Sequence, residues 1–156
     1  MKYYKSFYLK NFNEIDLSTV AQLKFGYRAY WSSELSCMVI ESLDHELKVT
    51  WVSFQSPILT KEIQKFYELK YKNESLLSIY EELENGIKIT FFKDFKASVY
   101  SIYTFHEDGK PKLFQEFNGD FELLEYRQSI YDENGKHIEE KIFYANSWTI
   151  HREKML

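Results

Sequence analysis

The alternation of apolar and polar residues predicts a series of β-strands in the second half of the chain. We expect six strands, at residues 87–92, 95–105, 112–117, 121–131, 137–144 and 148–152. The pairs Asp108-Gly109, Asn118-Gly119 and Asn134-Gly135 separate three of the consecutive strand pairs, and such pairs are typical of tight hairpin turns. Because connections this short join neighbouring antiparallel strands, the pattern predicts an antiparallel meander.

The first half of the chain mixes helix and strand patterns. Residues 3–9 predict a short strand. Residues 16–25 predict a helix with its apolar side chains on one face, and Gly26 is placed to end it. Two β-rich runs, residues 35–41 and 47–55, predict a hairpin.

The longest helical pattern begins at Ser56-Pro57, where serine can cap the first turn and proline suits the first helical position. It ends at Asn85-Gly86. Between them, a row of side chains recurs at three- and four-residue spacing, and all but Asn73 are apolar: Leu59, Ile63, Phe66, Leu69, Asn73, Leu76, Tyr80 and Leu83. This spacing predicts one amphipathic helix of about seven turns, or two shorter helices broken at Asn73.

These patterns together predict an α+β fold. We expect a strongly bent antiparallel β-meander of about six C-terminal strands, with an N-terminal hairpin, packed on one long or two short helices. The 156 residues suggest a single globular domain over residues 1–156. Tyr and Phe, at 13 each, are numerous, and aromatic side chains favour the half-buried surface of a sheet.

Charge and cysteine content point to a cytoplasmic protein. The longest stretch without a charged residue is residues 49–60, whereas a membrane span needs about 20 apolar residues. We expect no secretory leader, because lysines interrupt the first residues. A single cysteine, Cys37, excludes an internal disulfide, and its apolar neighbours predict that it is buried and structural.

A search for catalytic patterns finds no nucleophile elbow, phosphate-binding loop or metal-binding helix motif. The four histidines are scattered, so we expect no cofactor and no metal. Glutamates on adjacent strands (Glu116, Glu122, Glu125, Glu139 and Glu140) could meet in pairs, and a close pair would suggest glycosidase-type chemistry. We favour the simpler interpretation that they are solvated side chains on a sheet.

One short pattern occurs twice. Residues 105–110 and 131–136 share an aromatic residue followed by an acidic turn and Gly-Lys, and Phe117 and Phe143 follow at the same offset. The pattern resembles the aromatic hairpins of MORN-like repeat proteins. We interpret it as two hairpins with the same turn chemistry, and we infer no function from it.

The most informative charge feature is an acidic segment. Residues 73–86 carry four glutamates and no basic residue, and Glu81, Glu82 and Glu84 crowd the end of the predicted helix. Negative charge is unfavourable there because of the helix dipole, which suggests a role in binding rather than in stability. We predict a partner-binding surface formed by these three glutamates with Tyr80. A net charge of −4 argues against nucleic acid.

Three functions remain open. The first is a non-catalytic protein-binding module, because size, acidity and aromatic content make the chain look like bacterial immunity proteins that neutralise toxin domains. Such a protein would bind a partner with a basic face. The second is a carrier of a small apolar ligand in a cavity between sheet and helix. The third is an enzyme with a site of dispersed carboxylates and histidines.

Overall fold

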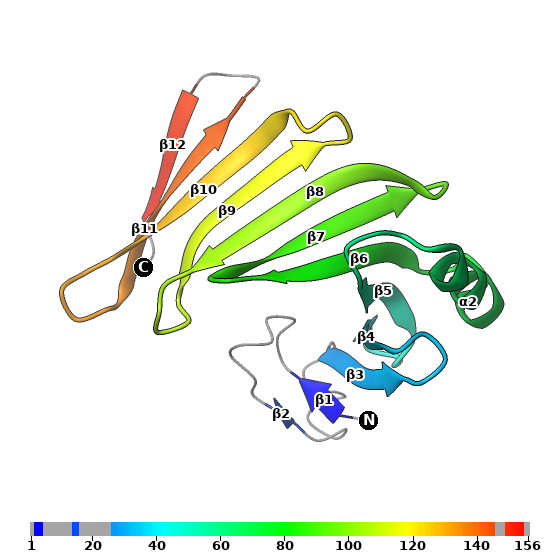
Figure 1. Cartoon of the computed structure of the whole chain (residues 1–156). Coiled ribbons are helices and arrows are strands. Elements are labelled where there is room, and N and C mark those ends of the chain that lie inside the picture. The colour runs from blue at the N-terminus through cyan, green and yellow to red at the C-terminus, as the bar shows by residue number, and fades with distance from the viewer. Residues whose placement is uncertain (1, 5–13, 16–25, 146–148, 155–156) are drawn as a thin grey trace. The chain divides into compact units, whose positions relative to one another are not determined.

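The computed structural model describes residues 2–4, 14–15, 26–145 and 149–154. The chain is mostly β, with 61% of residues in strands and 9% in helix. Hydrogen bonds connect the strands in the order β12-β11-β10-β9-β8-β7-β6-β5-β4-β3-β1-β2. The elements are β1 (Lys2–Tyr4), β2 (Glu14–Ile15), β3 (Gly26–Ser32), β4 (Cys37–Leu43), β5 (Val49–Gln55), α2 (Lys61–Tyr71), β6 (Leu76–Leu83), β7 (Gly86–Lys93), β8 (Lys96–Phe105), β9 (Pro111–Asn118), β10 (Leu123–Tyr131), β11 (His137–Tyr144) and β12 (Thr149–Lys154) (Figure 1).

Tertiary contacts divide the chain into two compact units. The first contains the residues up to Glu81 together with Phe91–Lys96. The second contains Glu82–Thr90 together with the residues from Ala97 onward. Two compact units are compatible with either one domain or two, so the single domain stays a prediction.

In the first unit, β3, β4 and β5 pair antiparallel, and β4 with β5 confirms the predicted N-terminal hairpin. The chain then passes through α2 and returns as β6, which pairs parallel to β5. Parallel neighbours need such a crossover because their ends lie far apart. The helix buries Ile63, Tyr67 and Tyr71 in one apolar core with Phe54 and Leu77 of the sheet. This core packs α2 against the sheet. The predicted carrier of a small apolar ligand stays a prediction.

The predicted α+β fold, with a long helix packed on the meander, is wrong. The helix is one short element, α2, and it ends at Tyr71 because Lys72 and Asn73 adopt left-handed backbone angles. The alternative of two shorter helices broken at Asn73 is wrong as well, because the segment after α2 is strand β6. Residues 77–80 of this strand are all buried, and periodicity alone cannot distinguish such a short apolar run from a helix.

Two further boundaries differ from the predicted ones. The helix begins after Thr60, whose hydroxyl accepts the N–H of Ile63 at 3.2 Å, and Ser56 instead hydrogen-bonds to the backbone of Ile58. Gly26 begins β3 rather than ending a helix. The predicted helix at residues 16–25 lies outside the described residues, as does most of the predicted strand at residues 3–9.

The second unit confirms the predicted meander. Each of the strands from β8 to β12 pairs antiparallel with the next, and the boundaries lie close to those expected from the sequence. Side chains on β9 and β10 are mostly half-buried. Aromatic side chains on these two strands are therefore partly packed against neighbouring side chains and partly exposed to solvent.

Four hairpin turns share one geometry. In each, the first residue donates its N–H to the carbonyl of the fifth and accepts from the N–H of the fourth. These turns begin at Asp44, His106, Asn118 and Asp132, and their fourth residues, all with positive φ, are Leu47, Gly109, Phe121 and Gly135. The turn at Asn118-Gly119 thus forms where predicted, but Phe121 and not Gly119 has the left-handed conformation.

Leu47 has a conformation that disfavours a side chain, so Leu47→Gly is expected to stabilise the protein by about 1 kcal/mol. Leu47 has φ 61°, and the equivalent positions 109 and 135 already hold glycine. Chemical denaturation of both forms measures the change. Gly135→Leu, the reverse change in the matching turn, should destabilise. A loss of stability in Leu47→Gly would show that its side chain outweighs the backbone strain.

Candidate functional site

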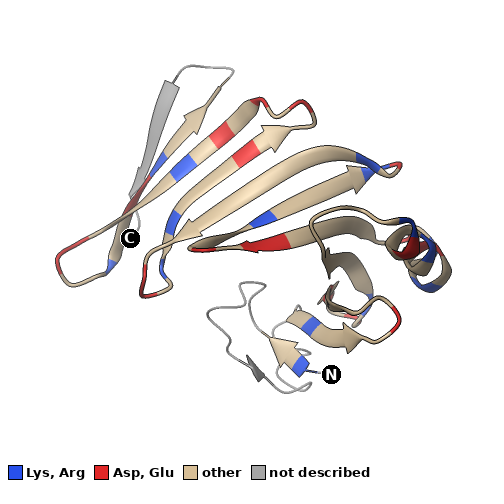
Figure 2. Ribbon diagram, in the orientation of Figure 1, with Lys and Arg blue, Asp and Glu red and all other residues tan. Residues whose placement is uncertain are grey.

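Alternate turns of the meander gather acidic side chains at one end of the second unit. The β6–β7, β8–β9 and β10–β11 turns lie at this end, because alternate connections of an antiparallel meander leave the sheet on the same side. The N–H of Phe105 donates to the carbonyl of Asn85 at 2.8 Å, so the first two turns are in contact. Five carboxylates occupy these turns against two lysines, Lys110 and Lys136, and a sixth, that of Glu82, lies at the end of β6 next to the first turn. We call this surface the acidic turn end: Glu82, Glu84, Glu107, Asp108, Asp132 and Glu133 (Figure 2).

Side-chain contacts hold the second and third of these turns together. Lys110 Nζ donates to the carbonyl of Gly135 at 2.8 Å, and the hydroxyl of Tyr131 donates to the carbonyl of Pro111 at 2.5 Å. The ring of Tyr131 contacts His106 and His137, with centroids 5.7 and 5.2 Å apart. The pattern that occurs twice in the sequence therefore corresponds to two neighbouring turns, with a half-buried tyrosine at their junction.

Two carboxylates of these turns, those of Asp108 and Asp132, accept hydrogen bonds from the backbone. Asp132 Oδ1 accepts the N–H groups of Asn134 and Lys136, both at 2.9 Å. A backbone hydrogen bond from Lys110, together with its charge, lowers the pKa of Asp108. Two of the six negative charges at this end, those of Asp108 and Asp132, therefore have defined positions, which suits them to recognition.

The residues predicted to bind a partner do not all lie on this surface. Glu82 and Glu84 are exposed at the β6–β7 turn, whereas Glu81 is half-buried on β6. Tyr80 has 0% of its surface exposed, so its side chain is part of the core. The helix-dipole argument is wrong here, since these residues lie at the end of a strand. The local excess of negative charge does not depend on that argument and is still present.

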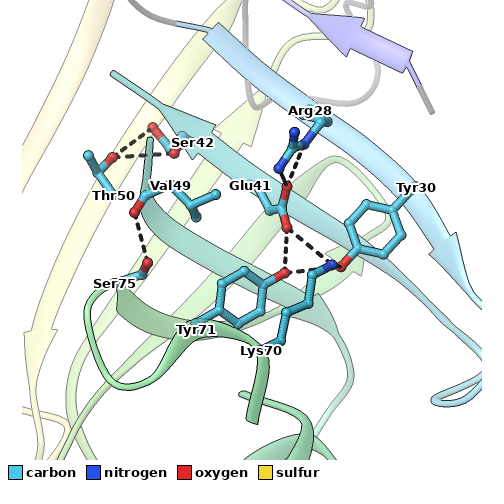
Figure 3. Close-up of polar contacts among 9 residues, drawn as sticks. All are labelled: Arg28, Tyr30, Glu41, Ser42, Val49, Thr50, Lys70, Tyr71 and Ser75. Atoms are coloured by element: carbon cyan, nitrogen blue, oxygen red, sulfur yellow. Dashed lines mark hydrogen bonds and ion pairs between the residues drawn. The ribbon is translucent and has the colours of Figure 1, made fainter. Parts of the chain in front are cut away.

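A second polar site lies in the first unit around the carboxylate of Glu41, which is fully buried on β4 (Figure 3). Arg28 Nε donates to its Oε2 at 2.6 Å, and the Tyr71 hydroxyl donates to its Oε1 at 2.5 Å. Lys70 Nζ lies 3.5 Å from the same Oε1. Tyr30 completes the group, with its hydroxyl 3.0 Å from that of Tyr71. We call these five residues the Glu41 network.

The protonation of two members is clear from their surroundings. Burial raises the pKa of Tyr71, as do its hydrogen bonds to Glu41 and Tyr30, so its hydroxyl stays a donor. Burial acts to lower the pKa of Arg28, but the charge of Glu41 and hydrogen bonds to Glu41 and Tyr3 outweigh it, and the net shift is upward. The network therefore ties the end of α2 to β3 and β4 through a permanent cation and a neutral phenol.

The structure brings one predicted carboxylate pair together. Glu116 on β9 and Glu125 on β10 lie directly opposite each other, and Arg127 forms an ion pair with Glu125. Burial raises the pKa of Glu116, and the charge of Glu125 raises it further. Since Glu125 is paired with arginine, Glu116 is the carboxylate that carries the unfavourable charge.

Glu116→Gln is expected to stabilise the protein at neutral pH, by about 0.2–1 kcal/mol, because like charges opposite each other in a sheet are destabilising. With its pKa raised on folding, Glu116 favours the folded state at low pH and loses that contribution as the pH rises through its folded pKa. The gain should therefore vanish near about pH 3, below the ordinary glutamate pKa. Urea denaturation at both pH values measures it, with Glu133→Gln as an exposed control. A gain that persists at the lower pH would contradict the charge argument.

Other sequence expectations can be compared with the described residues. Cys37 is buried, as predicted, and burial raises the pKa of its thiol. Within residues 2–4 and 26–145, whose side chains the structure describes, no three His, Cys, Asp or Glu side chains are placed to hold a metal ion. In the same part of the chain, no helix combines the length and the apolar character needed to cross a membrane.

The sequence patterns did not predict that the residues of the acidic turn end, or those of the Glu41 network, lie together. The acidic turn end could have been found, because the predicted turns and the rule that alternate turns share an end were sufficient to place it. The Glu41 network could not, since it depends on the register Arg28↔Glu41 and on the end of α2 at Tyr71. The chain matches no family model, no curated protein and no solved structure, so these groups must be judged on their geometry.

Proposed function

We propose that this protein is a non-catalytic binding module that holds the basic face of a partner protein against the acidic turn end. The observation that supports it is the placement of six carboxylates in or beside three turns at one end of the unit, with the half-buried ring of Tyr131 between two of these turns. Charges of one sign on a surface accelerate the encounter with an oppositely charged partner. A tyrosine at the centre of such a surface supplies contact area with little loss of conformational freedom.

In this proposal the protein acts in the cytoplasm as an immunity-type inhibitor, and the partner is a basic toxin domain. The acidic turns would steer the partner, and Tyr131 would provide the contact that slows dissociation. Glu82 and Glu84 keep the role predicted for them, while Glu107, Asp108, Asp132 and Glu133 extend the surface.

Affinity capture of the full chain from its native host, followed by purification of the captured protein, tests this proposal. Glu84→Lys/Glu133→Lys reverses two charges at the acidic turn end. Glu74→Lys/Asp120→Lys makes the same net change at exposed residues elsewhere. We expect the purified partner to bind the wild type and the control but to bind the first variant weakly. Equal binding to all three would contradict this surface, and turnover of a substrate by the chain alone would contradict the non-catalytic role.

A second candidate, binding of a small apolar ligand, is favoured by one observation. The meander carries a pocket of about 340 Å³ lined by Leu123, Tyr126 and Phe143 among others. Its volume is at the lower end of the range for small-molecule sites. Native mass spectrometry of the purified protein would detect such a ligand, and a spectrum of the bare chain alone would count against it.

A further inference from the structure

We propose that the Glu41 network forms the floor of a binding site for a small organic monocarboxylate, separate from the acidic turn end. The site is a pocket of about 640 Å³ in the first unit, a volume within the usual range for small-molecule sites. Residues of the network, Arg28, Glu41, Lys70 and Tyr71, line it together with Glu74 and Ser75.

The charge balance of the network calls for an anion. Two cations, Arg28 and Lys70, share the single carboxylate of Glu41, so these three side chains carry one excess positive charge. Both oxygens of Glu41 are already engaged, Oε2 by Arg28 and Oε1 by Tyr71 and Lys70. An anion bound beside Arg28 and Lys70 would balance this excess at the floor of the pocket through charge-assisted hydrogen bonds.

The exposed part of the network consists of donors. The Glu41 side chain is 0% exposed, whereas those of Arg28 and Lys70 are 26% and 43% exposed. A ligand entering the pocket therefore meets N–H groups and no free carboxylate from the network. Both cations are held in place, Arg28 by Glu41 and Lys70 by the hydroxyl of Tyr30. Fixed donors bind an anion with less loss of conformational freedom than mobile ones do.

The rim indicates the class of anion. Across the pocket lining, three cationic residues are balanced by three acidic ones, because Asp44, Lys48 and Glu74 add to the network. A polyanion such as phosphate would gain from Arg28 and Lys70 but be repelled at the rim. A ligand with a single carboxylate can bind the two cations without strong repulsion from the acidic rim. The planar guanidinium group of Arg28 also matches the geometry of a carboxylate. An amino acid is compatible as well, since its ammonium group can lie near the acidic rim.

NMR titration of the full chain with acetate, glycine and inorganic phosphate, at constant ionic strength, tests the proposal. We expect saturable shifts of the Arg28 side-chain N–H signal with acetate or glycine, and weaker binding of phosphate. Lys70→Gln should weaken acetate and glycine binding at least about tenfold, since it removes a charged donor. Lys65→Gln, which makes the same charge change elsewhere on α2, should bind as the wild type does.

Two results with the wild-type protein would overturn the proposal. One is the absence of a saturable shift at Arg28 in the wild-type protein with any of the three probes, a result that needs no variant. The other is tighter binding of phosphate than of acetate and glycine, which would exclude the monocarboxylate class. Equal weakening in Lys70→Gln and Lys65→Gln would likewise show that general charge, and not this pocket, attracts the anion.

Discussion

Phe54→Ala is expected to lower the free energy of unfolding by about 3–5 kcal/mol, the cost of a large cavity in a packed core. Phe54 is 0% exposed at the centre of the first unit. Its ring meets Phe66 and Tyr71 edge-on, with centroids 6.0 and 6.4 Å away. Those neighbours belong to α2, so the substitution also removes the contact that holds the helix on the sheet.

Urea denaturation followed by circular dichroism measures this effect. The matched control is Trp31→Ala on β3, which β4 separates from the strand of Phe54. The Trp31 side chain is 61% exposed, and surface changes of that kind usually stay within about 0.5 kcal/mol. A loss below about 1 kcal/mol for Phe54→Ala would contradict the position assigned to α2 in the core.

Gly86→Ala is expected to destabilise the second unit by about 1–3 kcal/mol or more, because the added methyl group has no space. A Cβ at Gly86 would lie 2.1 Å from the carbonyl oxygen of Tyr103, which is backbone inside a sheet and cannot rotate away. Gly119→Ala provides a graded comparison, since its Cβ would lie 2.8 Å from the carbonyl oxygen of Ala97. We therefore expect a smaller loss at position 119.

Thermal unfolding of Gly86→Ala and Gly119→Ala shows directly which variant loses more stability. Gly86 follows the β6–β7 turn, so a shift of the backbone there would also move Glu84 at the acidic turn end. A Gly86→Ala variant as stable as the wild type would show that β7 and β8 are not as close as the structure has them.

The sequence predicted the meander well because its signals are local. Asp108-Gly109 and Asn134-Gly135 define turns within a few residues, and the strands between them need only pair with their neighbours. At Asn118-Gly119 the chain also reverses at the expected place, although Phe121 and not Gly119 has the left-handed conformation. Local turn chemistry was sufficient there, whichever residue took the left-handed conformation.

The long helix failed for the opposite reason. Leu76, Tyr80 and Leu83 have helical spacing, but the parallel pairing of β6 with β5 decides their conformation, and that pairing joins residues about 25 positions apart. Local propensity is overridden by such non-local pairing. The wrong helix affected the prediction for the acidic residues less. Glu82 and Glu84 are exposed near a turn, whether a helix or a strand precedes that turn.

The association rate with the purified partner, measured by stopped flow across ionic strengths, tests the central claim most directly. If the acidic turn end steers a basic partner, Glu84→Lys/Glu133→Lys should associate on the order of tenfold more slowly than the wild type at low salt, with a weaker salt dependence. Glu74→Lys/Asp120→Lys, with the same net charge, should keep the wild-type rate. Equal rates for both double variants, at every salt concentration, would contradict the proposed surface.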